Sequence, residues 1–494
     1  MFKRGFDNDK YLKLQSQKIK ERISLFGERL YLEFGGKLFD DFHASRVLPG
    51  FAPDSKIRML AELRDDAEII IAINADDIEK NKVRGDIGIT YDLDVLRLID
   101  AFRGWGLYVG SVVMTRYKSH SLADAFIKKL NNLGIKVYKH YDIEGYPHNI
   151  PLIVSDDGFG RNEYAETSRS LVIVTGPGPG SGKMATCLSQ IYHESKMGRK
   201  SGYAKFETFP IWNLPLAHPV NLAYEAATAD LADVNMIDPY HLDTYGVTAV
   251  NYNRDVEVFP VLRSMLAGIL GECPYKSPTD MGVNMAGYCI YDDEAVTYAA
   301  KQEIIRRYYG ALCNQRKGNN NSVEIAKIEL LMQKLSVSYL DRPCVSAALM
   351  KAEATGEPAA AIELNDGRVV TGKTSSLLGA SSAALLNALK SIAGIDDAVD
   401  VISPEILEPI QVLKTKILGN HNPRLHTDEV LVALSVSAAS HELAKRAMDA
   451  LPALRYAEMH STVILSQVDE TTLRKLGLNL SSEPKYQTKK LFHN

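Results

Sequence analysis

The chain has 494 residues, of which 46% are hydrophobic and 24% are charged, and its formal net charge is -4. At roughly 100–200 residues per domain, this length predicts two to four domains, with apolar side chains for more than one core. The charge lacks the broad basic field that duplex nucleic acid requires, so we expect small-molecule partners and no nucleic acid.

Helices and strands alternate along the first 200 residues. Short apolar runs rich in β-branched residues indicate buried strands, whereas apolar residues three or four positions apart indicate helices. Helices are predicted at 9–25, 54–66, 92–102 and 120–133, and strands at 30–34, 68–73, 107–114, 135–138, 151–154 and 171–175. This alternation implies crossover connections and a mostly parallel sheet.

The chain changes character after residue 200. Residues 205–260 are rich in aromatic side chains and proline, and long connections of this kind tend to be functional. Residues 255–340 are predicted to be helical. Asn365-Asp366-Gly367 predicts a hairpin turn, helices follow at 380–393, 403–418 and 438–450, and a last strand lies near 461–466.

The predicted fold class is therefore α/β with three domains. We expect an N-terminal α/β domain at 1–230 that carries a mostly parallel sheet, a mainly helical middle domain at 231–340, and a second α/β domain at 341–494.

A loop of glycine and proline, Gly176 to Lys183 (GPGPGSGK), joins a predicted strand to a predicted helix. Glycine lets backbone N–H groups curl around phosphate oxygens, and the helix start adds unpaired N–H groups and a positive dipole end. Lysine adds a mobile charge. This order of elements is that of a P-loop. The predicted phosphate- or nucleotide-binding residues are Gly176, Gly178, Gly180, Ser181, Gly182, Lys183 and Thr186, with Lys183 also a catalytic candidate and ATP the first nucleotide to consider.

The loop departs from the G-x-x-x-x-G-K-[ST] pattern at two positions. Pro177 stands at the first glycine, and Met184 replaces the Ser or Thr that contacts Mg²⁺. The nearest hydroxyls belong to Ser181 and Thr186, and Thr186 lies on a different side of the helix from the position after the lysine. Either Mg²⁺ is held by other groups, or the loop binds phosphate without that contact. The alternative is a glycine-rich turn with no ligand.

Acidic residues at the ends of predicted strands are the candidates for a metal ligand and for catalysis. Asp238 follows one apolar segment, and Asp156 and Asp157 follow another. Asp157 and Asp238 are therefore candidate Mg²⁺ ligands, and Asp238 is also a catalytic candidate. Such residues more often form turns or cap helices.

Two further segments contain groups suited to binding or catalysis. Lys373, Thr374, Ser375 and Ser376 follow a strand and precede a helix, where they offer donors for a second anion; the alternative is a capped helix. The segment Asn420 to Glu429 contains the acid–base candidates His421, His426 and Asp428. Its spacing fits no metal motif, and Thr427 is an alternative helix cap.

The five cysteines contain no C-x-x-C pair, which argues against a disulfide framework or a zinc site and favours a reducing compartment. The basic start of the chain is not followed by an apolar segment of a signal peptide, and no run of 18 apolar residues predicts a membrane span. We therefore expect a cytoplasmic protein without membrane partners and, by default for such an enzyme, a symmetric homo-oligomer.

Several blocks together resemble one bacterial family, the domain of unknown function 1846 family, over essentially the whole chain. The blocks are GFDNDKY at 5–11, YLEFGGKLFDDFHASRVLPGF at 31–51, GPGPGSGKMATCLSQ at 176–190, FPIWNLPLAHPVNLAYEAATADL at 209–231 and PRLHTDEVLVALSVSAA at 423–439. The resemblance implies an N-terminal α/β domain, a helical middle and a C-terminal α/β domain. It implies no catalytic residues, and it implies that Met184 belongs to the family's own pattern.

Three functions are compatible with these observations. The first is an enzyme that uses ATP or a related nucleotide for phosphoryl transfer or hydrolysis. The second is an enzyme that acts on a phosphorylated metabolite without a nucleotide, with His421, His426 or Asp428 as acid–base groups. The third is a non-catalytic nucleotide sensor or scaffold.

Overall fold

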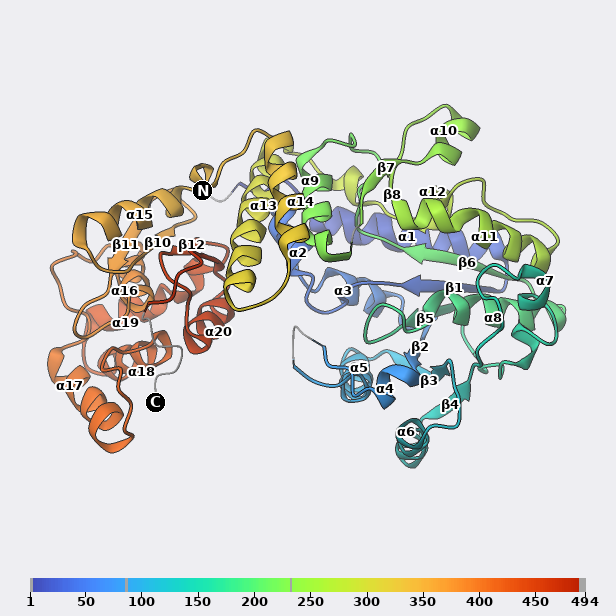
Figure 1. The fold of residues 1–494 in the computed structure, drawn as a ribbon, viewed down its shortest axis with the longest axis horizontal. Helices are drawn as coiled ribbons and strands as arrows, with labels where there is room; N and C mark the ends of the chain where they lie inside the picture. Colours follow the sequence, from blue (N-terminus) through green and yellow to red (C-terminus); the bar gives the residue numbers. More distant parts are fainter. Residues whose placement is uncertain (1–2, 85–87, 232, 488–494) are drawn as a thin grey trace. The chain divides into compact units, whose positions relative to one another are not determined.

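The computed structural model describes residues 3–84, 88–231 and 233–487 (Figure 1). The chain divides into two compact units. The N-terminal unit contains residues 5–225 and 233–296, and the C-terminal unit contains residues 297–487 together with 3–4 and 226–231 of the described chain. The predicted middle domain, 231–340, is thus divided between the two units.

The N-terminal unit is built on a seven-stranded sheet with the order β4-β3-β2-β5-β1-β6-β9, in which every neighbouring pair is parallel. The strands are β1 (Arg29–Phe34), β2 (Ala67–Asn74), β3 (Tyr108–Thr115), β4 (Lys136–Lys139), β5 (Leu171–Thr175), β6 (Ser201–Phe206) and β9 (Gly282–Val283). All eight residues of β2 are buried, as expected for an apolar strand covered on both faces. The predicted mostly parallel sheet is confirmed.

Helices cover both faces of this sheet (Figure 1). One core joins side chains such as Leu32 and Ile173 to α1 (Asn8–Phe26), α3 (Ser55–Glu62), α5 (Tyr91–Gly104) and α6 (Ser121–Asn132). The other joins Tyr31 and Val174 to α7 (Ile150–Ile153), α8 (Lys183–Lys196) and α11 (Asn253–Leu270). The strand predicted at 151–154 is wrong: this segment is helix α7, with a proline in its first turn, where the missing N–H costs no hydrogen bond.

Shorter elements complete the N-terminal unit, and two of them, α9 and η2, include residues that belong to the C-terminal unit. They are α2 (Phe42–Val47), α4 (Ala75–Glu79), η1 (Phe159–Arg161), α9 (Pro219–Ala227), η2 (Ala229–Leu231), β7 (Asn235–Ile237), α10 (Pro239–Tyr245), β8 (Val250–Tyr252), α12 (Pro278–Met281) and η3 (Ala286–Cys289). Strands β7 and β8 form a separate antiparallel pair.

The chain leaves the two central strands of the parallel sheet in opposite directions. After β5 it enters α8, which packs on one face, whereas after β1 it continues to α3, which packs on the other face. Strands β5 and β1 are direct neighbours. In open parallel sheets, ligands bind outside the carboxyl ends of the strands where the connections diverge in this way. The fold therefore directs attention to the ends of β5 and β1.

The C-terminal unit contains a four-stranded sheet with the order β11-β10-β12-β13. Strands β10 (Ala359–Glu363) and β11 (Val369–Lys373) form the predicted hairpin, and β12 (Glu458–Ser461) pairs antiparallel with β10 and parallel with β13 (Asn479–Ser482). Its helical elements are α13 (Asp293–Arg316, which begins in the N-terminal unit), α14 (Ser322–Lys334), η4 (Tyr339–Asp341), α15 (Pro343–Thr355), α16 (Ala380–Ala393), α17 (Pro404–Val412), the π-helical segment η5 (Leu413–Ile417), α18 (Thr427–Ala438), α19 (Glu442–Asp449), η6 (Leu451–Leu454) and α20 (Gln467–Lys475).

The second α/β domain is thus confirmed, although two of its strands differ from the prediction. The strand expected at 461–466 is β12, which ends at Ser461, and β13 was not predicted from the sequence. Within the described ranges, no helix is long and apolar enough to span a membrane.

Candidate functional site

The loop at 176–182 joins β5 to α8 at the carboxyl end of a central strand. Gly180 and Gly182 have φ angles of +76° and +87°, which side chains other than glycine rarely adopt. Gly182 is the N-cap of α8, and no side chain of the described residues caps this helix start. The first-turn N–H groups of α8 therefore point out of the helix with no side-chain acceptor, as they do at anion-binding helix starts.

Packing explains the other glycines of the loop. A Cβ atom at Gly176 would lie 2.4 Å from the carbonyl oxygen of Ala72, and one at Gly178 would lie 2.4 Å from the hydroxyl of Tyr91. The loop is also fixed from β3, two strands away from β5 in the sheet, because the Thr115 hydroxyl donates to the carbonyl of Ser181 over 2.8 Å. These glycines would be required with or without a ligand, so the case for a ligand depends on Lys183 and its neighbours.

Lys183 is half-buried and folds back on its own loop. Its Nζ atom lies 3.3 Å from the carbonyl oxygen of Gly178 and 3.4 Å from the Ser181 hydroxyl, which are long hydrogen bonds. Burial lowers the pKa of Lys183, and the charge of Lys205 adds to this effect while Glu33 opposes it. The ammonium group therefore sits in a poorly solvated position without an ion pair in the described protein, where an anionic ligand would stabilise it.

The two predicted hydroxyl groups of this loop are both withdrawn from the solvent. Ser181 and Thr186 are fully buried. The Thr186 hydroxyl has no hydrogen-bond partner among the described residues. Neither residue replaces the exposed Ser or Thr hydroxyl that the P-loop pattern places directly after the lysine.

A cluster of charged side chains that sequence reasoning missed lies on the α8 and α11 side of the sheet. Glu33 of β1 is the register partner of Lys205 of β6, and the Tyr203 hydroxyl donates to Glu33 Oε2 over 2.7 Å. The Lys205 ammonium contacts the Asp255 carboxylate and lies 2.9 Å from Glu207 Oε1. We call Glu33, Tyr203, Lys205, Glu207 and Asp255 the strand-end cluster.

Burial shifts the pKa values of the charged groups in this cluster. It raises the pKa of Glu207 to about 8; Lys205 opposes the shift and Asp255 adds to it. For Lys205, burial favours the neutral amine, but the charges of Asp255 and Glu207 hold its pKa well above the ordinary value. The raised pKa favours the protonated form of Glu207 beside the lysine cation. A carboxyl group that titrates near the working pH is suited to general acid–base chemistry.

The predicted metal ligands, Asp157 and Asp238, lie elsewhere in the N-terminal unit. Asp238 is fully buried and caps α10: it accepts hydrogen bonds from the backbone of Tyr240 and His241, and from the backbone and hydroxyl of Thr279. Asp157 is exposed. Among the residues that the structure describes, no group of three or more His, Cys, Asp or Glu side chains is placed to hold a metal ion.

The two other predicted segments meet in the C-terminal unit. The Arg424 side chain donates through Nε to the carbonyl of Ser375 over 3.0 Å. His426 Nδ1 lies 3.0 Å from Oδ2 of Asp469, which sequence reasoning missed because it is 43 residues further along the chain. Lys373, Ser375, Ser376, His421 and Asp428 are exposed, and Thr374 is buried. His426 and the loop at 373–376 therefore belong to one region, separate from the loop at 176–182.

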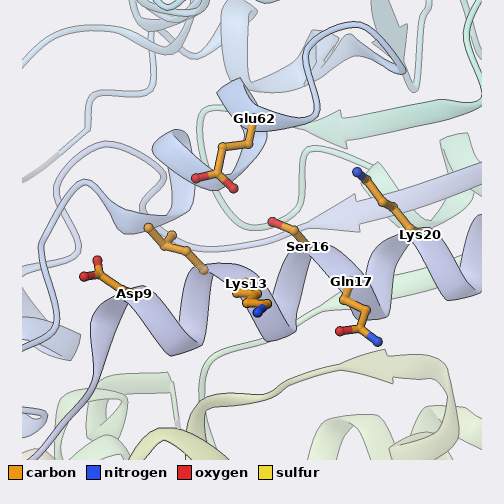
Figure 2. Close-up of a pocket in the computed structure, with 7 residues that line it drawn as sticks. Asp9, Lys13, Ser16, Gln17, Lys20 and Glu62 are labelled. Carbon is orange, nitrogen blue, oxygen red and sulfur yellow. The ribbon is translucent and has the colours of Figure 1, made fainter.

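A third region is a hollow of about 420 Å³ on the outer side of α1 and α3 (Figure 2). Six of its lining residues recur at helical spacing on α1, and Glu62 ends α3. They are Asp9, Leu12, Lys13, Ser16, Gln17, Lys20 and Glu62. Basic and acidic groups both line it, as on a solvated helix surface, and we assign the hollow no chemical role.

Comparison with known proteins covers nearly the whole chain. A family profile described as "Domain of unknown function DUF1846, N-terminal" matches residues 4–336, and its C-terminal counterpart matches residues 340–492. A UPF0371 protein of Corynebacterium glutamicum is 60% identical over 489 residues, which is 99% of each chain. A UPF0371 protein of Streptococcus thermophilus is 57% identical over 492 residues, which is 100% of each chain.

Proposed function

The chain belongs to the DUF1846 family, and from its site we propose that it is an enzyme that binds a phosphate-bearing small molecule at Gly176–Lys183, with ATP-dependent phosphoryl transfer or hydrolysis as the first reaction to test. The observation that supports this most is the position of Lys183. Its ammonium group is half-buried at the point where the connections of β5 and β1 diverge, and no acidic side chain of the described protein lies in ion-pair contact with it.

The chain's own groups suggest how such a ligand would be held. Backbone N–H groups of the loop and of the first turn of α8 would donate to phosphate oxygens, and Lys183 would turn from the Gly178 carbonyl to the ligand. Lys205 would add a second positive charge on the same side of the sheet. Preorganised donors of this kind stabilise the negative charge that develops during phosphoryl transfer.

A Mg²⁺ ion that accompanies a nucleotide needs only one or two protein carboxylates, because the phosphates and water supply its other ligands. Glu33 is the carboxylate whose charge acts directly on Lys183. Glu33, which accepts from the Tyr203 hydroxyl through Oε2, is the carboxylate that would contact a magnesium–nucleotide complex in this proposal. The ion would neutralise charge on the phosphates, while Asp238 remains committed to capping α10.

The second candidate is an enzyme that acts on a phosphorylated metabolite without a nucleotide. Two observations favour it: Met184 occupies the position of the magnesium-binding hydroxyl, and Glu207 combines a pKa of about 8 with a lysine partner. In this case the loop would hold the substrate's phosphate group, and Glu207 would exchange a proton with the rest of the substrate.

Calorimetric titration distinguishes these candidates. We would titrate the full chain with ATP, ADP, GTP, AMP, inorganic phosphate and a sugar phosphate, each with and without Mg²⁺, and repeat the series with Lys183→Ala. Lys196→Ala is the matched control, because Lys196 is exposed at the other end of α8. We expect Lys183→Ala to weaken binding by roughly 10- to 100-fold, the loss of one charge-assisted hydrogen bond.

The ligands that bind decide between the two candidates. Binding of ATP that depends on Lys183 supports the nucleotide enzyme, whereas binding of inorganic phosphate and the sugar phosphate alone supports the second candidate. If Lys183→Ala and Lys196→Ala bind every ligand as the wild type does, the loop is not a phosphate site and both candidates fail.

We further propose a cytoplasmic location and a symmetric homo-oligomer. The odd number of cysteines, all of them free, suits a reducing compartment, and closed symmetry is usual for enzymes of this size. Light scattering of the purified chain tests the second proposal, and a monomer at micromolar concentration would contradict it.

A further inference from the structure

The C-terminal unit brings the starts of two helices together. Leu378, just before α16, forms a parallel bridge with Leu425, just before α18. The Leu425 N–H donates to the Leu377 carbonyl over 2.9 Å, and the Ser382 hydroxyl donates to the Leu425 carbonyl over 3.0 Å. Since the two preceding segments run in the same direction side by side, the positive dipole ends of α16 and α18 lie next to each other.

A histidine held by a carboxylate lies at this junction. Asp469 Oδ2 is 3.0 Å from His426 Nδ1 and accepts a hydrogen bond of 2.7 Å from the Ser466 hydroxyl, and Asp469 Oδ1 accepts one of 2.8 Å from the Thr427 N–H. Asp469 is buried, whereas 26% of the His426 side chain is exposed. Asp469 therefore fixes the ring through Nδ1 and leaves Nε2 without a hydrogen-bond partner in the described parts of the chain. A carboxylate that holds one ring nitrogen in this way orients the other nitrogen for a ligand or substrate.

Lys414 and Arg424 balance the charges of Glu429 and Asp469, so this region carries a positive excess when His426 is protonated. Glu429 accepts a hydrogen bond from the backbone N–H of His426 and forms an ion pair of 2.7 Å with Lys414. Arg424 uses only its Nε donor, on the Ser375 carbonyl. In the portion of the structure that can be described, Arg424 has no acidic partner. The Asp469 hydrogen bond raises the pKa of His426 despite its partial burial, and Lys414 and Glu429 act in opposite directions.

We propose that His426 Nε2 and the Arg424 guanidinium form a second ligand site, in the C-terminal unit, for the oxyanion of a small molecule. The neighbouring loop at 373–376 and the two helix starts supply further donors. Buried hydroxyls that lack partners within the described residues, those of Thr374 and Thr427, occur in both segments that form this site. The site is independent of the loop at 176–182, which belongs to the other unit.

Binding to the Lys183→Ala chain tests this proposal, because that background weakens the other anion site. Inorganic phosphate and succinate would be titrated separately by calorimetry at pH 6.0 and pH 8.5. The variants are His426→Gln and Arg424→Gln, and His421→Gln, an exposed histidine of the same segment, is the control. Thermal unfolding of each variant confirms that it is folded.

We expect at least one of the two anions to bind at pH 6.0, with an affinity about 10-fold lower at pH 8.5, because the His426 ring is protonated less at the higher pH. Arg424→Gln should weaken binding by about 10-fold. The affinity of His426→Gln should depend less on pH than that of the His421→Gln control. Stronger binding of phosphate identifies a phosphate-bearing ligand, and stronger binding of succinate a carboxylate. If neither anion binds, or if both glutamine variants bind as the control does, the proposal is wrong.

Discussion

The two candidate sites differ in how the fold assembles their charges. In the C-terminal unit, Arg424 and His426 are two residues apart in the chain, and the site lies at the surface. In the N-terminal unit, Lys183, Lys205 and Asp255 come from α8, β6 and α11, and the ends of parallel strands bring them together. The comparison shows that a surface site can be recognised from neighbouring residues, whereas a site at strand ends depends on the order of the strands.

Lys205→Met should have the largest effect, because it leaves the buried Glu207 and the half-buried Asp255 without their shared cation. Removing one partner of a buried ion pair costs about 3–5 kcal/mol. Lys196→Met, which breaks an exposed pair with Asp156, should cost less than about 1 kcal/mol. Urea denaturation measures both changes in the free energy of unfolding. Equal, small losses would show that the strand-end cluster is solvated and not a buried network.

Glu207→Gln should change how stability depends on pH. The folded-state pKa of Glu207 is about 8, above the ordinary value, so the folded chain binds this proton more tightly than the unfolded chain. Its stabilising effect is present below about pH 4.5 and is lost as the pH rises through 8, by up to about 1.4 kcal/mol per pH unit. Relative to wild type, Glu207→Gln should gain stability between pH 5 and pH 8 in urea denaturation series. Parallel curves for the two proteins would contradict the raised pKa.

Asp469→Asn should also change how the free energy of unfolding depends on pH, in the same direction as Glu207→Gln but by less. Asp469 raises the pKa of His426 in the folded state, so the stability that this charged hydrogen bond contributes is present below about pH 6.5 and is lost as the pH rises through the folded pKa. The wild type should exceed Asp469→Asn by about 1 kcal/mol more at pH 5.5 than at pH 8.5. Thermal melts at the two pH values measure the difference, which a purely structural Asp469 would leave constant.

Lys183→Ala should have the smallest effect on stability. Its two hydrogen bonds are long and its half-buried ammonium has no ion pair within the described protein, so we expect a change within about 0.5 kcal/mol, or a gain. The contrast with Lys205→Met separates a lysine kept for a ligand from one that holds buried acids together. Urea denaturation of both variants in phosphate-free buffer makes the comparison, and a loss above about 2 kcal/mol for Lys183→Ala would assign it a structural role.

The sequence alone predicts much of this fold, for reasons that the structure makes clear. The buried strands β2 and β5 are short β-branched runs, and the loop at 176–182 interrupts the pattern with four glycines. Segment 151–154 was misread because four apolar residues in a row have no distinguishing period. Glu33 and Glu207 could not be found in this way, since nothing in the sequence specifies that β1 lies between β5 and β6.

Hydrogen exchange in the presence of ATP tests the central claim, that the loop at Gly176–Lys183 binds phosphate, most directly. No side chain of the described residues caps the start of α8, so a phosphate bound there should slow exchange of the N–H groups of its first turn and of the loop before it. With mass spectrometric detection, we predict protection of peptides that cover 176–185 in the wild type, and none in Lys183→Ala at the same ATP concentration. Exchange in 176–185 that is unchanged by ATP, by inorganic phosphate and by a sugar phosphate would contradict the claim.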